Sequence, residues 1–172
     1  MDLSPEQIAA IRSVLWSAFA ATDDPMAESD WEHALGGLHF VVEDGGVIGA
    51  YASVAERPIR IGGRLLRTGY LEAVAVAPDR HGRGIGSVLM GEVDGYIRDN
   101  FELGALGTGV HHFYERLGWF TWRGESFVRE PGGGLRATPD EDGYIMVLQT
   151  PSTPALDPKA SIECDSRDGE AW

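Results

Sequence analysis

The sequence predicts a mixed α/β fold, an α+β arrangement in which helices flank a central, mostly antiparallel sheet. Two observations lead to this fold class: capped helical segments come first, and alternating strand segments joined by glycine turns follow. The third observation is size, since 172 residues with 43% apolar side chains suffice for one domain with a packed core. We therefore expect one domain over residues 1–150 and a tail over residues 151–172.

The first helix has a clear start signal. Ser4 can cap the helix, Pro5 suits its first position, and Gln7 completes a capping box. The helix should end near Ala20, ahead of a loop sequence, and its apolar face carries Ile8, Ile11, Leu15, Ala18 and Phe19. A second, short helix is expected from residue 29 or 30 to the glycine pair at 36–37.

Strand patterns occupy the next part of the chain. Residues 38–43 and 47–55 should form a hairpin around Asp44-Gly45-Gly46. Residues 59–61 and 64–67 should form another around Gly62-Gly63. Residues 70–76 follow as an apolar strand, in which Glu72 is the only charged side chain.

The remaining elements alternate between helix and strand. A glycine-rich loop precedes a helix at residues 85–100, and a short strand is expected at 103–106. Residues 110–117 predict a helix closed by Gly118. Residues 119–122 and 144–148 should complete the sheet.

Charge and composition limit the possible partners. The net charge of −13 argues against a protein that binds duplex nucleic acid, and it favours either solubility or the attraction of polycationic small molecules. No apolar run is long enough for a membrane span, and the first residues lack a signal-peptide pattern, so we expect a cytoplasmic protein without a membrane partner. The single cysteine, Cys164, agrees with a reducing compartment.

The stretch "PDRHGRGIGSVLM", residues 78–90, predicts an anion site. A strand, a glycine-rich turn and a helix start present unpaired amides at the positive end of a helix dipole. A P-loop is excluded because no lysine follows Gly86, and the glycine spacing differs from a dinucleotide fingerprint. The alternative is a purely structural turn before a buried helix.

The wider stretch "LEAVAVAPDRHGRGIGSVLM" resembles the acetyl-CoA signature of the GNAT superfamily of N-acetyltransferases, although His81 replaces the usual Arg or Gln. The resemblance implies a GNAT fold whose sheet splays at its middle strands, and acetyl-CoA as co-substrate, with backbone groups near Val74 and Val76 pairing with its pantetheine arm. It implies that the coenzyme contacts are Val74, Ala75, Val76, His81, Gly82, Arg83, Gly84, Ile85 and Gly86, with Arg80 supplying further charge.

Several stretches resemble one branch of that superfamily, the aminoglycoside 2'-N-acetyltransferases: "DWEHALGGLHF", "GYLEAVAV", "LGAL", "TPDEDG" and the ending "CDSRDGEAW". This resemblance implies acetyl transfer to the 2'-amine of a cationic aminoglycoside, antibiotic resistance, and a homodimer. It implies a tail that folds back over the acceptor site, bringing the Trp172 carboxylate to the substrate. The implied substrate contacts are Asp24, Asp30, Glu72, Ala73, Gly107, Asp140, Glu141, Glu170 and Trp172. Loop acids that are merely solvated are the alternative.

The chemistry needs a base for the amine and an acid for the thiolate. Alternation places Glu72 on one strand face with Val74 and Val76, where it can take protons through water, while the Val74 amide polarises the thioester oxygen. Tyr114, in the "FYERLGW" stretch that resembles the family's second landmark, is the expected acid. The alternatives are that Glu72 pairs with a buried arginine such as Arg67, and that Tyr114 is a core aromatic.

His111 and His112 have no third ligand at a recognisable spacing, so no metal site is expected. Three other functions stay open. The substrate could be a related antibiotic that keeps the 2' amine on a different scaffold. The chain could acetylate another amine, such as a polyamine, a cell-wall amino sugar or a peptide N-terminus. It could also be a coenzyme-binding regulatory domain without catalysis, although the presence of both Glu72 and Tyr114 argues against this.

Overall fold

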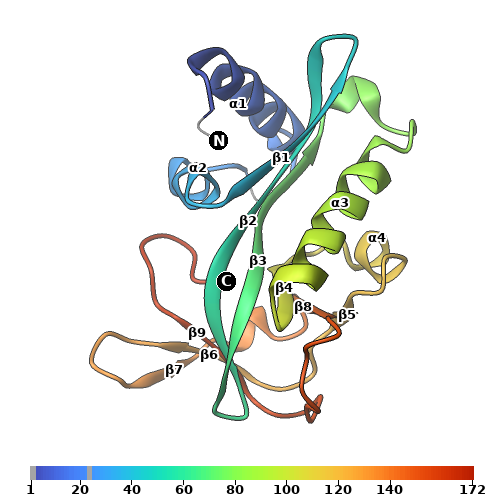
Figure 1. Ribbon diagram of the computed structural model, residues 1–172. Coiled ribbons are helices and arrows are strands. Elements are labelled where there is room, and N and C mark those ends of the chain that lie inside the picture. Colours follow the sequence, from blue (N-terminus) through green and yellow to red (C-terminus); the bar gives the residue numbers. More distant parts are fainter. Residues whose placement is uncertain (1–2, 23–24) are drawn as a thin grey trace. The chain divides into compact units, whose positions relative to one another are not determined.

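The structure, a computed structural model, describes residues 3–22 and 25–172. The chain forms two compact units: unit 1 is Met1–Ala55 with Leu71–Asp94, and unit 2 is Glu56–Tyr70 with Gly95–Trp172. Strands β2 (Val47–Ile61) and β3 (Arg64–Val76) and helix α3 (Ile85–Asn100) contribute residues to both units (Figure 1). In the described ranges, no helix has the length and apolar character needed to cross a membrane.

Two helices open unit 1. Helix α1 (Pro5–Phe19) has the expected capping box: the Ser4 hydroxyl accepts from the Gln7 amide at 3.2 Å, and the Gln7 side chain accepts from the Ser4 amide at 2.9 Å. Helix α2 (Glu28–Leu35) begins slightly earlier than predicted, because its N-cap is Ala27. Both helices supply residues to one core, namely Ile11, Val14, Leu15, Trp31, Ala34, Ile48, Tyr51, Ala73 and Ala75.

The first hairpin of unit 1 confirms the glycine turn. Strand β1 (Leu38–Asp44) pairs antiparallel with β2, and Gly45 and Gly46 take φ values of +65° and +78°, which favour glycine. The prediction that the second strand ends at residue 55 was wrong, since β2 continues through Pro58 to Ile61. Pairing with β1 reaches only Val54, and pairing with β9 begins only at Ile59. Pro58 therefore falls outside the registers of β2 with β1 and with β9.

The segment after β3 has the structure that the sequence predicted. The short 3-10 helix η1 (Pro78–Arg80) leads into the glycine loop, and α3 has the predicted bounds of 85–100. Strand β3 itself is longer than predicted, because residues 64–67 and 70–76 form one strand.

Among the described residues, unit 2 contains two parallel pairs, β3 with β4 and β6 with β9, in an otherwise mostly antiparallel sheet. Strand β4 (Leu103–Gly107) pairs parallel with β3 over residues 68–70 only, and it pairs antiparallel with β8 (Ile145–Gln149) along its whole length. Pairing between β3 and β4 stops at Tyr70 and Ala105, although β3 continues to Val76. This early end is the splayed arrangement expected for the middle strands. Helix α4 (His111–Glu115) and strand β5 (Phe120–Thr121) follow β4.

Three short strands of unit 2 were not predicted: β6 (Ser126–Arg129), β7 (Leu135–Ala137) and β9 (Ile162–Asp165). Strand β9 lies between β2 and β6, antiparallel to the first and parallel to the second. A second 3-10 helix, η2 (Pro139–Glu141), precedes β8. Part of the segment 151–172 is thus an internal strand of the sheet.

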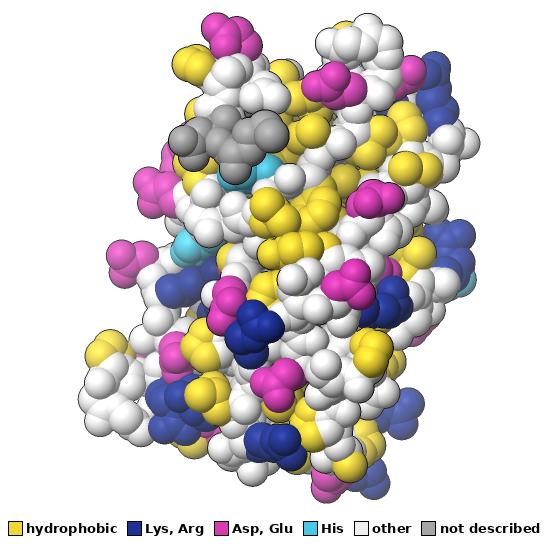
Figure 2. All heavy atoms as spheres, viewed as in Figure 1, with side chains coloured by type: hydrophobic (Ala, Val, Ile, Leu, Met, Phe, Trp, Pro, Cys, Tyr) yellow, Lys and Arg dark blue, Asp and Glu magenta, His cyan; other side chains and the backbone are white. Residues whose placement is uncertain are grey.

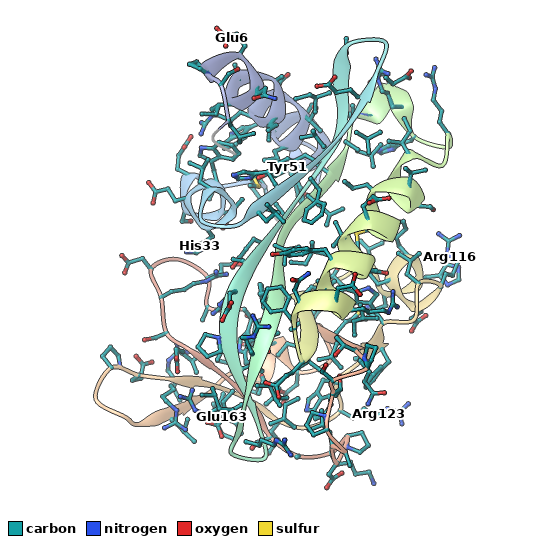
Figure 3. The ribbon with its side chains drawn as sticks, viewed as in Figure 1. Glu6, His33, Tyr51, Arg116, Arg123 and Glu163 are labelled. Atoms are coloured by element: carbon teal, nitrogen blue, oxygen red, sulfur yellow. The ribbon has the colours of Figure 1, made fainter. Side chains whose placement is uncertain are left out.

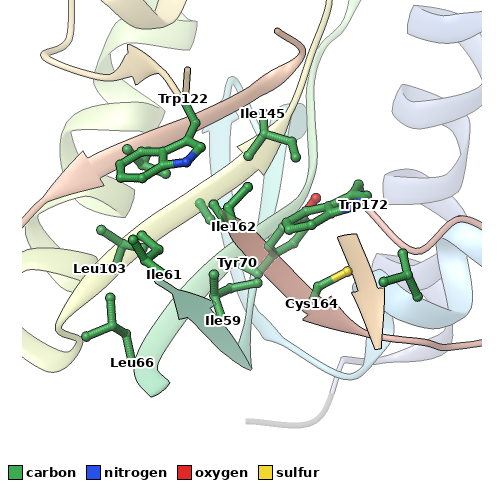
Figure 4. Close-up of a cluster of buried hydrophobic side chains, with 13 residues drawn as sticks. Ile59, Ile61, Leu66, Tyr70, Leu103, Trp122, Ile145, Ile162, Cys164 and Trp172 are labelled. Atoms are coloured by element: carbon green, nitrogen blue, oxygen red, sulfur yellow. The ribbon is translucent and has the colours of Figure 1, made fainter. Parts of the chain in front are cut away.

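The core of unit 2 includes the end of the sequence (Figure 4). Trp172 is 7% exposed and belongs to a cluster with Tyr70, Trp122 and Cys164. Its indole Nε1 donates a hydrogen bond to Thr138 Oγ1 at 3.2 Å. The aromatic side chain at position 172 is therefore a packed part of unit 2.

Candidate active site

The glycine-rich loop joins β3 to α3 within unit 1. Gly82 and Gly84 have φ values of +77° and +76°, and a Cβ atom added at either position would meet no atom within 4 Å. The Ser87 amide donates to the Gly84 carbonyl at 3.0 Å. The amides of Ile85 and Gly86 precede this first helical donor and have no partner within the helix. Open space and N–H groups at the positive end of α3 suit an anion.

Two arginines of this loop share one carboxylate. Arg80 Nη1 lies 2.5 Å from Asp44 Oδ2, and Arg83 Nη1 lies 3.4 Å from the same oxygen. The Arg80 side chain is 16% exposed and packs against Gly49, where an added Cβ would lie 2.7 Å from Arg80 Cδ. The Arg83 side chain is 59% exposed. Arg80 is thus held inside unit 1, and Arg83 is the arginine that solvent and solutes can reach.

His81 bonds back to the strand before the loop. Its Nε2 lies 3.0 Å from the carbonyl oxygen of Val76, so the ring donates at the end of β3. A ligand that pairs with this carbonyl has to share it with His81 or displace the ring. The sequence motif did not indicate this contact.

Burial alternates along the last part of β3, as the sequence predicted. Glu72, Val74 and Val76 are half-buried, whereas Ala73 and Ala75 are 7% and 4% exposed and pack in the core of unit 1. Only the backbone of the two alanines is available to a ligand. Glu72 therefore shares a strand face with the two valines.

The salt-bridge alternative for Glu72 required a buried arginine. Arg67 is not buried: its side chain is 54% exposed and lies 3.5 Å from Glu56. The Arg67 amide also donates to Glu102 Oε2 at 2.9 Å. Arg67 thus has acidic partners of its own in unit 2.

Tyr114 lies in unit 2, on the short helix α4. It is 9% exposed, and its ring makes edge contacts with Phe113 and Trp119, with centroid distances of 5.0 and 6.1 Å. Its carbonyl accepts from the amides of Leu117 and Trp119. The ring is therefore fixed by aromatic packing, which agrees with a structural role and is compatible with a positioned hydroxyl.

The acidic residues predicted to bind substrate have different surroundings. In unit 1, Asp30 Oδ2 accepts from the Ala27 amide at 2.8 Å and so caps α2. Asp24 lies outside the described residues. In unit 2, Asp140 and Glu141 lie in η2, which begins directly after Thr138. The Thr138 hydroxyl accepts from the Trp172 indole.

Unit 2 brings Gly107 and the end of the sequence together. A Cβ added at Gly107 would lie 3.6 Å from the carbonyl carbon of Trp172 and 3.6 Å from the Tyr70 hydroxyl. Glu170 is exposed, and its carbonyl accepts from Arg167 Nε at 2.7 Å. Thr138, Gly107 and Trp172 therefore lie close to one another within this unit.

The two histidines on α4 have ordinary surroundings. His111 Nε2 lies 2.7 Å from the Gly143 carbonyl oxygen, and His112 is exposed. Among the described residues, no group of three or more His, Cys, Asp or Glu side chains could hold a metal ion. On the face displayed in Figure 2, acidic side chains are scattered among Lys and Arg side chains and form no continuous patch.

Comparisons with known proteins identify the family of the chain. The family model described as "Acetyltransferase (GNAT) family" matches residues 7–119. An aminoglycoside 2'-N-acetyltransferase from Mycolicibacterium fortuitum is 35% identical over 174 residues, which cover 99% of this chain and 88% of that protein.

Solved structures share the fold. A GNAT family acetyltransferase from Brucella melitensis in complex with acetyl-CoA superposes with a TM-score of 0.63 at 21% identity, covering 94% of this chain and 92% of that one. A GNAT family N-acetyltransferase from Escherichia coli in complex with CoA gives a TM-score of 0.66 at 17% identity, covering 94% and 86%. Since the family model spans the glycine loop and the similarity to the curated relative extends over nearly the whole sequence, the chain belongs to the acetyltransferase (GNAT) family.

Proposed function

We propose that this GNAT acetyltransferase transfers the acetyl group of acetyl-CoA to the 2'-amine of aminoglycosides and thereby confers resistance to them. The observation that carries the proposal is the 35% identity to an aminoglycoside 2'-N-acetyltransferase over 99% of the chain. A match of this length includes the segments proposed for the coenzyme and for the acceptor.

Unit 1 supplies the proposed coenzyme contacts. The amides of the 82–86 loop bind the pyrophosphate, and the exposed guanidinium of Arg83 adds a cation beside them. Backbone groups of Val74 and Val76 pair with the pantetheine arm in the manner of an added strand. The open space above Gly82 and Gly84 supports this role, because a phosphate has to approach the backbone closely.

Two side chains carry the proposed proton transfers. Glu72, on the half-buried face of β3, accepts the proton of the attacking amine through a water molecule. Tyr114 donates its phenolic proton to the departing thiolate of coenzyme A. The Val74 amide stabilises the negative charge that develops on the thioester oxygen. The amine nitrogen forms the new bond to the acetyl carbon as the carbon–sulfur bond breaks.

Carboxylates recognise the ammonium groups of the acceptor in this proposal. The candidates with described positions are Asp30, Asp140, Glu141 and Glu170, with Trp172 and Gly107 supplying further contacts. Asp30 also caps α2, so its second oxygen is the one left for a ligand. Charge-assisted hydrogen bonds of this kind suit a polyamine sugar.

The test is a thiol-release assay with a panel of amines. The panel contains a matched pair of aminoglycosides, one with an amine at the 2' position and one with a hydroxyl there, together with spermidine, glucosamine and an N-terminal peptide. We expect rapid release of coenzyme A only with the 2'-amine, and NMR of the product should place the acetyl group on that nitrogen.

Other outcomes separate the alternatives. Equal rates with both members of the pair would contradict the 2' assignment. Faster turnover of spermidine, glucosamine or the peptide would move the activity to another amine. Acetyl-CoA binding without thiol release on any acceptor would indicate a regulatory domain.

A further inference from the structure

Arg57 joins the two ends of an exposed loop in unit 2. Its Nη2 donates to the carbonyl oxygen of Ala171 at 2.7 Å and to that of Asp165 at 3.4 Å. The residues between these carbonyls form the 166–170 loop, which contains Gly169 with a φ of +74°. One side-chain nitrogen thus closes the base of this loop.

The rest of the guanidinium is also fixed. Its Cζ lies 4.5 Å from the centroid of the Tyr70 ring, an arrangement typical of a cation–π contact. Its Nη1 is buried and has no hydrogen-bond partner among residues 3–22 and 25–172. The carbonyls of Asp165 and Ala171 are main-chain groups, so the guanidinium restrains the backbone at both ends of the loop.

The loop that Arg57 closes carries a residue of the proposed acceptor site. Arg167 Nε donates to the Glu170 carbonyl at 2.7 Å, and Cys164 Sγ lies 3.4 Å from the Ala171 carbonyl oxygen. The carbonyl of Glu170 thus accepts a hydrogen bond from Arg167, and the carbonyl of the following residue, Ala171, accepts one from Arg57. The backbone of Glu170 is restrained on both sides, whereas its side chain is exposed.

We infer that Arg57 is a positioning residue for the acceptor: it holds the 166–170 loop closed and so sets where the Glu170 carboxylate stands. This inference rests on the proposed function, in which Glu170 binds an ammonium group. In this inference the guanidinium acts through the loop and not by direct contact with the acceptor or the coenzyme. Because its effect is on binding geometry, the loss should appear in the Michaelis constant of the acceptor.

A neighbouring arginine provides a matched control. Arg60 lies on the same strand and binds the side chain of Asp165, with Nη1 to Oδ1 at 2.9 Å. This pair is partly exposed, at 24% and 47%, and it contacts only one end of the loop. An exposed ion pair of this kind contributes little, so Arg60→Gln should leave the loop closed.

The first measurement compares steady-state kinetics of Arg57→Gln, Arg57→Lys and Arg60→Gln with a 2'-amino aminoglycoside. We expect Arg57→Gln to raise the acceptor KM by about tenfold, the size of one hydrogen bond to a charged group. The value of kcat and the KM of acetyl-CoA should stay within about twofold of the parent. Arg57→Lys keeps a positive charge near Tyr70 but loses the planar guanidinium that binds the two carbonyls. Its acceptor KM should therefore lie between those of the parent and Arg57→Gln.

The second measurement needs no catalysis. Trypsin cuts after Arg167, inside the loop, and mass spectrometry detects the loss of residues 168–172. Cleavage at this site should be faster in Arg57→Gln than in the parent, and unchanged in Arg60→Gln. Arg57→Lys serves for both measurements if Arg57→Gln does not fold.

The outcomes keep the two proposals apart. A parent that acetylates the 2'-amine, with an unchanged acceptor KM in Arg57→Gln, overturns the role of Arg57 alone. An equal rise in KM for Arg60→Gln also overturns it, because the effect would then be general to the strand. A parent without activity on any aminoglycoside overturns the proposed function and with it the acceptor role, and the trypsin rates then show only whether Arg57 closes the loop.

Discussion

Arg80 and Asp44 form the shortest ion pair of the glycine loop, with Nη1 2.5 Å from Oδ2, although 36 residues separate them in the sequence. The pair connects the turn between β1 and β2 to the segment that precedes α3. It gives the two arginines of the loop different surroundings. Arg80 is mostly buried, whereas Arg83 is exposed.

Arg83→Ala should weaken coenzyme A binding by about tenfold with little change in stability, because the exposed guanidinium is the one that a phosphate can reach. Arg80→Ala should instead lower the free energy of unfolding by about 1–2 kcal/mol, since it removes a mostly buried partner of Asp44. Calorimetric titration and urea unfolding measure the two effects. Equal losses of affinity with unchanged stability would assign both arginines to the coenzyme.

Gly84→Asp should abolish most coenzyme A binding. The substitution forces a side chain into a φ of +76°, at a cost of about 1–2 kcal/mol, and it points a carboxylate at the proposed phosphate position. Gly133→Asp is the control, because Gly133 has a φ of +83° and equally open surroundings in the turn between β6 and β7. Calorimetry should show loss of binding only at position 84, and a folded Gly84→Asp protein with the parent's affinity would exclude the loop as the pyrophosphate site.

Glu72→Gln should lower kcat by up to about 100-fold, the range for one acid–base group, with coenzyme affinity nearly unchanged. Glutamine keeps the size of the half-buried side chain and removes its basicity. Glu56→Gln is the control: Glu56 is exposed and pairs with Arg67, so this variant should have the kcat of the parent. If Glu72→Gln turns over within about twofold of the parent across the pH range, Glu72 has a structural role.

Glu170→Gln should raise the acceptor KM by several-fold without changing the KM of acetyl-CoA, because it removes one charge from the proposed acceptor site. Asp168→Asn, at another exposed position of the same loop, provides the control. The difference between the variants should shrink as salt is added, since screening weakens charge pairs at an open site. The same acceptor KM for Glu170→Gln and Asp168→Asn would show that Glu170 is a solvated acid without a role in acceptor binding.

Stability should fall in mild acid through His39. Its Nδ1 lies 2.8 Å from the hydroxyl of Tyr51. Tyr51 is buried and is labelled in Figure 3. Burial lowers the pKa of His39 in the folded protein, and burial raises the pKa of Tyr51 to about 12. In the unfolded chain the pKa of this histidine is about 6.5, so the unfolded chain takes up the proton at a higher pH than the folded protein does. As the pH falls below about 6.5, the free energy of unfolding therefore decreases.

Urea unfolding at pH 7.5 and 5.5 measures this loss. His39→Gln should reduce the difference in unfolding free energy between the two pH values, because the group that takes up the proton is gone. Replacing the exposed His112 should leave the difference as in the parent. An unchanged difference in His39→Gln would show that other groups, such as the carboxylates, cause the acid sensitivity.

The elements with local signals could be predicted from the sequence. The start of α1 was predicted from Ser4, Pro5 and Gln7. The bounds of α3 were predicted from the glycine loop and the apolar sequence that follows it. The alternation that places Glu72 with Val74 and Val76 is likewise a property of neighbouring residues. Signals of this kind depend on backbone sterics and capping, which act within a few residues.

Features that depend on distant partners could not be predicted. Strand β9 has only four residues, Ile162–Asp165, and it is a strand because β2 and β6 pair with it from both sides. Asp44 reads as a turn residue, and nothing near it in the sequence indicates Arg80 as its partner. Such contacts arise from tertiary packing, which overrides local preference.

The place of β9 also has a kinetic consequence. Among the described strands, the β6–β7 hairpin joins the rest of its sheet through β9, so its hydrogen bonding to the sheet requires residues 162–165 to have paired with β2. That pairing is remote in sequence, since the Arg60–Asp165 contact spans 105 residues. Closing so long a loop costs chain entropy before any contact is gained, which makes such steps slow. We therefore expect amide protons of β6 to gain protection from hydrogen exchange late in refolding, together with those of β9.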